Sequence, residues 1–144
     1  MLLVLVALAV AAQWYTRRPI AEERIDATFT MCGLGRAHAC VVDGDTIKLG
    51  QRKVRMLGID APETVEPRCE EERALGREAS RRLLDLLNSG PVWLITTAER
   101  DHDDYGRDLR RIEVVTGTGR LAIGDILVRE GLAARYDGAK ADWC

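Results

Sequence analysis

The sequence predicts a mixed α+β fold: a five-stranded β-barrel with one long helix between strands 3 and 4 and a shorter helix after strand 5. Three observations support this prediction. Three segments rich in alternating or β-branched residues precede residues 61–90, and two more follow them. Apolar residues recur at helical spacing within residues 61–90. Gly50 and Gln51 form a tight link, as in a meander. Together these features are typical of a small Greek-key barrel of the OB type.

The individual elements follow in chain order. Strands are expected over residues 27–32, 39–49, 52–60, 91–98 and 109–115. A loop with two prolines precedes the long helix. Three glutamates suit the first turn of this helix, and its apolar positions are Leu75, Ala79, Leu83 and Leu86. Residues 121–131 predict the short amphipathic helix, and the tail that follows shows no periodicity.

The N-terminal segment, residues 1–18, predicts an export signal or a membrane anchor. Its apolar run from Leu2 to Ala12 is short for the roughly 30 Å hydrocarbon core, which favours a signal peptide. The aromatic pair and two arginines that follow resemble an interfacial anchor, so both alternatives stay open. We therefore expect membrane contact by this segment, a linker over residues 19–28, and an extracytoplasmic, monomeric domain over residues 29–144.

Composition limits the possible functions. Hydrophobic residues make up 47% of the chain and charged residues 31%, which is typical of a globular domain and not of a disordered one. The formal net charge is −2. A protein that coats nucleic acid electrostatically is normally basic, so any contact with nucleic acid is expected to be local.

Four cysteines on an exported chain predict two disulfides. A zinc site is excluded because there is no C-x-x-C pair and the two histidines lack metal-ligand spacing. Of the three possible pairings, we favour Cys32 with Cys40 across a glycine-containing hairpin, which leaves Cys69 to pair with Cys144. Free buried thiols are the alternative.

The stretch "VVDGDTIKL" alternates like a strand, yet Asp43 and Asp45 flank Gly44 within it. Aspartate is a poor strand former, and neighbouring carboxylates repel each other. One interpretation is a tight hairpin turn in which Gly44 supplies a positive φ. The other is a functional acidic site.

A second acidic pair, Asp60 and Glu63, ends the strand segment expected to pair with this one. A hairpin would bring Asp45 near Asp60 at the mouth of the barrel. Converging carboxylates predict a hard divalent cation such as Ca²⁺, bound by two aspartates, a carbonyl oxygen and waters. A purely structural calcium site is the alternative.

Two arginines change this expectation. Arg55 precedes Asp60 on the same segment, and Arg107 lies in the loop "DDYGR", beside Tyr105. A cation with two guanidinium groups forms a receptor for a phosphate. Glu63 would then be free to deprotonate a water molecule, which predicts hydrolysis of a phosphodiester.

The motifs "VVDGDTIKL", "RMLGIDAPET", "LGREA", "DDYGR" and "DILVREGLA", in this order, resemble the staphylococcal nuclease (thermonuclease) family. The resemblance extends from about Val41 to Ala133. It implies an OB barrel with packed helices and Ca²⁺-dependent endonucleolytic cleavage of DNA and RNA at the P–O5′ bond, which leaves 3′-phosphates.

The resemblance also implies roles for individual residues. Metal ligands are the side chains of two aspartates and one main-chain carbonyl, from Asp45, Asp60 and Ala61. Catalytic residues are the general base Glu63 and the phosphate-binding Arg55 and Arg107. Asp43 would hold waters around the ion, and substrate contacts would come from Tyr105 and Tyr136.

This chain departs from the family pattern in three places. Ala61 replaces a threonine, and the lysine-rich loop before the long helix is here the acidic "VEPRCEEE". The family usually adds a last helix after the position of Cys144, and we expect the Cys69–Cys144 bridge to replace that helix as a clamp. The alternative function is an OB-fold module that binds nucleic acid or protein without catalysis, because the same barrel is also used for recognition alone.

Overall fold

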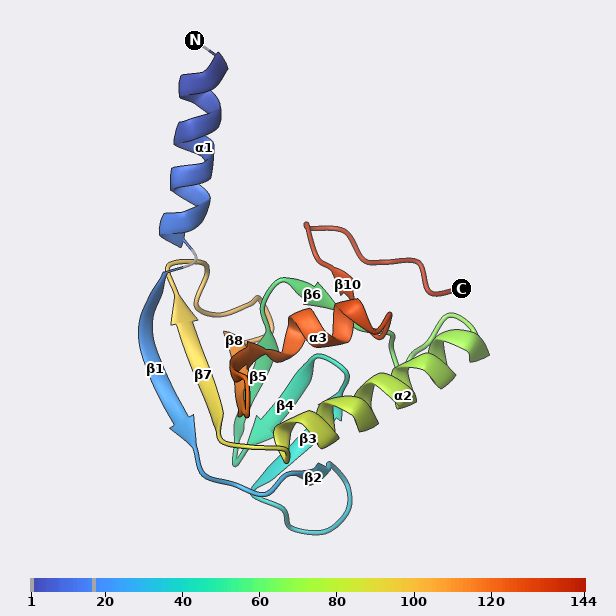
Figure 1. Cartoon of the computed structure of the whole chain (residues 1–144). Coiled ribbons are helices and arrows are strands. Elements are labelled where there is room, and N and C mark those ends of the chain that lie inside the picture. Colours follow the sequence, from blue (N-terminus) through green and yellow to red (C-terminus); the bar gives the residue numbers. More distant parts are fainter. Residues whose placement is uncertain (1, 17) are drawn as a thin grey trace.

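The computed structural model of the chain describes residues 2–16 and 18–144. Its helices are α1 (Leu2–Thr16), α2 (Glu70–Leu87) and α3 (Ile123–Arg129). Its strands are β1 (Pro19–Ile25), β2 (Thr30–Met31), β3 (Ala39–Asp43), β4 (Thr46–Leu49), β5 (Arg52–Met56), β6 (Ile59–Asp60), β7 (Val92–Thr97), β8 (Asp108–Thr116), β9 (Gly119–Ala122) and β10 (Ala134–Arg135). The long helix before β7 and the short helix after β8 confirm the predicted positions of both helices (Figure 1).

The main sheet differs from the predicted closed five-stranded barrel. Within the described residues it has eight strands in the order β1-β7-β8-β5-β4-β3-β2, with β9 beside β8, and it is not closed. Closure of a five-stranded barrel would require β3 to pair with β7. The free edges of those strands are instead occupied by β2 and β1, two strands consecutive in sequence (Figure 1).

Residues 19–25 were expected to form part of a linker, but they form β1. This segment pairs antiparallel with the edge of β7, and Glu23 forms two hydrogen bonds with Arg52 of β5, at 2.9 and 3.0 Å. The free edge and this ion pair explain why a polar segment is ordered. The tail without periodicity also forms a strand, β10, which pairs with β6.

The stretch "VVDGDTIKL" is the β3–β4 hairpin, which confirms the turn interpretation. The expected positive φ at Gly44 is wrong, since Gly44 is absent from the positive-φ glycines. Gly44 is needed for space: a Cβ there would lie 2.8 Å from the Cβ atoms of both Ala61 and Ala79. Gly50 does adopt a positive φ, of 60°, between β4 and β5.

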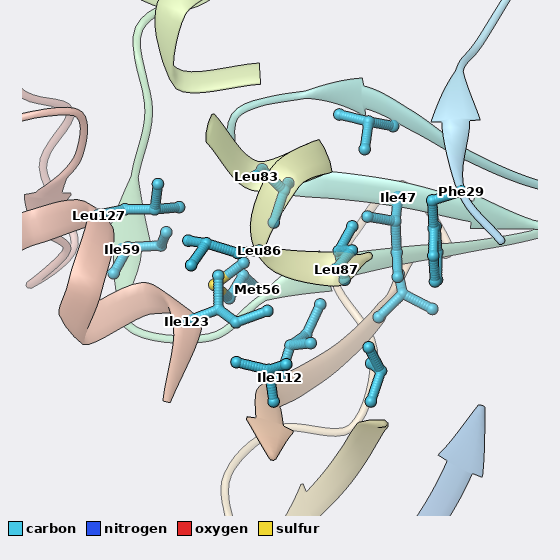
Figure 2. Close-up of a cluster of buried hydrophobic side chains, with 14 of the residues drawn as sticks. Phe29, Ile47, Met56, Ile59, Leu83, Leu86, Leu87, Ile112, Ile123 and Leu127 are labelled. Atoms are coloured by element: carbon cyan, nitrogen blue, oxygen red, sulfur yellow. The ribbon is translucent and has the colours of Figure 1, made fainter. Parts of the chain in front are cut away.

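The hydrophobic core lies between the sheet and the two packed helices. Figure 2 shows Leu83, Leu86 and Leu87 of α2 among side chains from β4, β5 and β8. Ile123 and Leu127 of α3 pack on the same cluster. The core thus fixes α2 and α3 on the sheet.

Both favoured disulfides, Cys32–Cys40 and Cys69–Cys144, are present in the structure. Helix α1 stands away from the sheet (Figure 1), and its described side chains are largely exposed. Among the described residues, no helix has the length and apolar character needed to cross a bilayer.

Candidate active site

A polar cleft of about 400 Å³ brings together most of the predicted site residues. It is lined by Asp43, Asp45, Lys53, Arg55, Asp60, Glu63, Tyr105, Arg107 and Lys140. These residues come from the β3–β4 turn, β5, β6, the loop after β6, the loop before β8 and the C-terminal tail. Two lysines in this set were not predicted.

The Arg55 guanidinium joins the two predicted metal-binding aspartates. Its Nη2 lies 3.4 Å from Asp45 Oδ2 and 3.7 Å from Asp60 Oδ1. Both aspartates are almost fully buried, with 7% and 4% exposure. Gly58, with a φ of 75°, bends the chain between β5 and β6, so that Arg55 and Asp60 face each other despite their odd spacing.

Asp45 is held in place by further donors. The Ala61 backbone N–H donates to its Oδ2 at 3.0 Å, and the Thr46 hydroxyl donates to its Oδ1 at 2.9 Å. Asp43 accepts the backbone N–H of Asp45 at 3.2 Å. Burial, followed by the negative charge of Asp45, raises the pKa of Asp43 to about 7.

Buried Glu72 of α2 orders the loop that carries Glu63. Its carboxylate accepts the backbone N–H of Glu63 at 3.3 Å and that of Arg68 at 2.7 Å. Gly76 permits this contact, because a Cβ there would lie 2.7 Å from the carbonyl oxygen of Pro62. The glycine of "LGREA" is therefore explained by the close approach of this loop to α2.

Arg107 is positioned by Asp103 of its own loop. The Asp103 carboxylate accepts Arg107 Nε at 2.6 Å and the backbone N–H groups of Tyr105 and Arg107, each at 2.9 Å. Burial alone would raise the pKa of Asp103, but these hydrogen bonds outweigh it and lower the pKa. Gly106, with a φ of 74°, makes the turn.

The C-terminal tail reaches the same cleft. Lys140 Nζ lies 2.9 Å from Glu63 Oε1, and the Ala141 backbone N–H donates to Asp60 Oδ2 at 3.0 Å. The hydrogen bond that Lys140 donates to Glu63, assisted by the negative charge of Glu63, raises the pKa of Lys140 above its usual value. Beyond Ala141, the disulfide at Cys144 joins the tail to the start of α2.

Tyr136 does not line this cleft but contacts one of its residues. It lines a neighbouring hollow of about 810 Å³, and the Arg55 guanidinium is 5.4 Å from its ring centroid. Tyr105 is highly exposed, and its ring centroid is 5.4 Å from the Arg107 guanidinium. The substrate-binding roles of both tyrosines stay predictions.

The donor set fits a hard cation. No group of three or more His, Cys, Asp or Glu side chains in the described part of the chain is arranged to hold a metal ion. The predicted set is different: two carboxylates and a main-chain carbonyl, completed by waters. Asp45 and Asp60 are buried and share one guanidinium, that of Arg55. Two negative charges therefore face one positive charge, so a bound cation would be attracted to this pair.

Sequence reasoning missed Lys53, Glu72, Asp103 and Lys140. Asp103 had a local signal, since an aspartate two residues before Tyr105 can accept the backbone N–H of that residue in an Asx turn. Glu72 was assigned only to the first turn of the helix. Lys140 had no signal, because 77 positions separate it from Glu63.

Comparison with known proteins agrees with this geometry. The family model "Staphylococcal nuclease homologue" matches residues 53–142. The chain is 39% identical over 97 residues to SPbeta prophage-derived endonuclease YokF and 38% identical over 97 residues to endonuclease YncB, both of Bacillus subtilis (strain 168). It is 35% identical over 97 residues to thermonuclease of Staphylococcus hyicus.

These alignments cover 64%, 64% and 65% of this chain, respectively. They span only 31%, 43% and 54% of the relatives' own lengths. The family match itself extends over more than half of the 144 residues, from β5 to the C-terminal tail. The chain therefore belongs to the staphylococcal nuclease homologue family.

Proposed function

We propose that this chain is a calcium-dependent endonuclease that hydrolyses phosphodiester bonds of DNA and RNA and leaves 3′-phosphate ends. One observation carries the proposal: two buried aspartates, two arginines and one glutamate from separate elements line a single cleft. A structural domain would not need two guanidinium groups in the same cleft as these acids. The names of the endonuclease and thermonuclease relatives support the same reaction class.

Asp45, Asp60 and the main-chain carbonyl of Ala61 would hold Ca²⁺. When bound, the ion supplies positive charge next to a phosphoryl oxygen. Arg55 is already anchored to both aspartates, so a phosphate next to these acids would contact its guanidinium. Asp103 accepts the Nε of Arg107, and within the described residues no hydrogen bond engages the two terminal nitrogens of this guanidinium, which can therefore bind a phosphate.

Glu63 is the candidate base. Its half-exposed carboxylate can accept a proton from a water molecule, whose oxygen attacks the phosphorus. The P–O5′ bond breaks as the new P–O bond forms, O5′ takes up a proton from solvent water to become a 5′-hydroxyl, and Glu63 later returns its proton to solvent. Arg55 and Arg107 would stabilise the negative charge that develops on the phosphoryl oxygens in the transition state.

Incubation of the full chain with denatured DNA and with RNA, in Ca²⁺ or in EGTA, tests the proposal. We expect shortening only in Ca²⁺, products with 3′-phosphates by mass spectrometry, and loss of activity in Glu63→Gln and Arg107→Ala. Glu66→Gln, an exposed glutamate of the same loop, is the matched control and should stay active. Binding without cleavage would instead identify a non-catalytic module.

We also propose that the domain acts outside the cytosol as a monomer, with residues 1–18 contacting a membrane during export or as an anchor. The two disulfides support an oxidising compartment. Fractionation of cells expressing the full chain, with detection of the domain, tests this location. Recovery in the cytosol with reduced cysteines would contradict it.

A further inference from the structure

Lys53 and Lys140 line the cleft but have no role in the hydrolysis proposed above. Lys53 lies two residues before Arg55 on β5, so both side chains leave the same face of the strand. Lys53 also pairs in register with Lys48 of β4. Within the described residues, neither Lys53 nor Lys48 forms an ion pair with an acidic side chain. Like charges directly opposite each other destabilise a sheet, so folding does not explain this pair.

The backbone of the tail near Lys140 is fixed at the cleft. The Ala141 N–H donates to buried Asp60, and the Ala141 carbonyl accepts Arg68 Nη2 at 3.1 Å. The disulfide from Cys144 to Cys69 anchors the end of the tail beside the first turn of α2, and Figure 1 shows the tail running from β10 toward that turn. Two hydrogen bonds and one disulfide therefore hold the backbone beside Lys140 at the cleft.

The Lys140 side chain itself is only weakly held. Its ion pair with Glu63 is exposed, with side-chain exposures of 70% and 41%. Ion pairs this exposed shift an equilibrium by about fivefold or less. Lys140 is thus too loosely bound to block the cleft, and a phosphate can draw its ammonium group away from Glu63.

We propose that Lys53 and Lys140 bind the phosphates on either side of the scissile phosphate. The inference rests on the function proposed above and adds two substrate-binding residues to the same site. With Arg55 and Arg107, these lysines place four cations along one cleft of a chain whose formal net charge is −2. A small cluster of cations on an acidic chain is the kind of local nucleic-acid contact that the net charge led us to expect.

The test is the salt dependence of binding. The full chain is titrated against a fluorescent single-stranded DNA of 12 nucleotides in EDTA, which prevents cleavage, between 50 and 200 mM salt. Each contacted phosphate contributes about 0.7 to the slope of log K against log salt for single strands. The slope is negative, and Lys53→Gln and Lys140→Gln should each make it less steep by about 0.7. Each variant should also bind several-fold more weakly at low salt.

Two controls separate a phosphate contact from a general charge effect. Arg129→Gln removes the same charge from an exposed position of α3 outside the cleft, and it should leave the slope unchanged. Lys140→Arg should keep the slope of the unmodified chain. Thermal melting of each variant checks that the fold is retained.

Slopes like that of Arg129→Gln in both lysine variants would overturn the inference. Tighter binding or faster cleavage by Lys140→Gln would also overturn it, because the tail would then obstruct the site. If the unmodified chain cleaves DNA in Ca²⁺ and the lysine variants bind normally, only this inference fails. If the slopes fall as expected but Ca²⁺ produces no cleavage, only the proposed function fails.

Discussion

Replacing Glu72 by glutamine should destabilise the loop that carries Glu63. Glu72 is 3% exposed, and its two carboxylate oxygens accept backbone N–H groups from Glu63 and Arg68. Glutamine keeps the volume but turns one acceptor into an NH₂ donor. At least one backbone N–H therefore faces another donor inside the protein.

The size of the effect follows from these contacts. A hydrogen bond to a charged group contributes about 1.5–3 kcal/mol, and a buried donor left unpaired adds a further cost, so we expect a loss of about 3 kcal/mol. For a domain of this size, that loss lowers Tm by about 10 °C. Because Glu63 is carried on the same loop, kcat should fall as well.

The pH dependence gives the prediction a second readout. The hydrogen bond from the Arg68 backbone is the largest influence and holds the pKa of Glu72 below its usual 4.5. A lowered pKa in the folded state means that the stabilisation is complete above the unfolded pKa and is lost as pH falls through the folded pKa. The deficit of Glu72→Gln should thus be full at pH 7 and shrink below about pH 4.5.

Urea unfolding and thermal melting at several pH values measure this deficit. Glu71→Gln is the matched control, since Glu71 is the exposed neighbour in the same helical turn, and it should change stability by less than about 0.5 kcal/mol. Equal melting of the two variants would refute the role assigned to Glu72. A deficit that does not shrink in acid would refute the electrostatic part.

Three further predictions concern the site and the tail. Asp103→Asn should lower kcat/KM about 10- to 100-fold, because Arg107 loses a charge-assisted hydrogen bond of about 1.5–3 kcal/mol; steady-state kinetics with unchanged values would contradict this. Burial and nearby carboxylates raise the pKa of Asp43 from 3.8 to about 7, so its folded-state cost builds up between these pH values. In EDTA, Asp43→Asn should therefore gain stability over the unmodified chain as pH rises from 4 to 7, as measured by melting; a constant difference would contradict it. Cys144→Ser should cost about 2–4 kcal/mol in urea unfolding, because it removes the bridge to Cys69, and an unchanged midpoint would count against this.

Much of the site could be predicted because its residues belong to short motifs. Asp45, Asp60 and Glu63 stand in or beside two consecutive hairpins, and a hairpin brings its strands together by local pairing. Arg107 is not brought to the site by such local pairing. Its position depends on the parallel pairing of β5 with β8, whose ends are more than 50 residues apart in the chain.

The fold prediction failed where long-range pairing decides. The expected barrel is an open sheet because β1 and β2 cover the edges of β7 and β3, and nothing in the polar letters of residues 19–25 indicates this pairing. Gly44 was correctly placed in a turn, but the reason was different. Its missing side chain makes room for Ala61 and Ala79, which come from distant parts of the chain.

The sequence by itself determined the helices, most of the strands, the Cys32–Cys40 bridge and the acids and arginines that line the cleft. These features depend on periodicity, turn residues and motif order, all of which act over a few neighbouring positions. The tertiary structure alone decided the open sheet, the support of the Glu63 loop by Glu72 and the approach of Lys140 to Glu63. Those contacts join segments that local preference leaves independent, and only packing around the shared core and the Cys69–Cys144 bridge sets their distances.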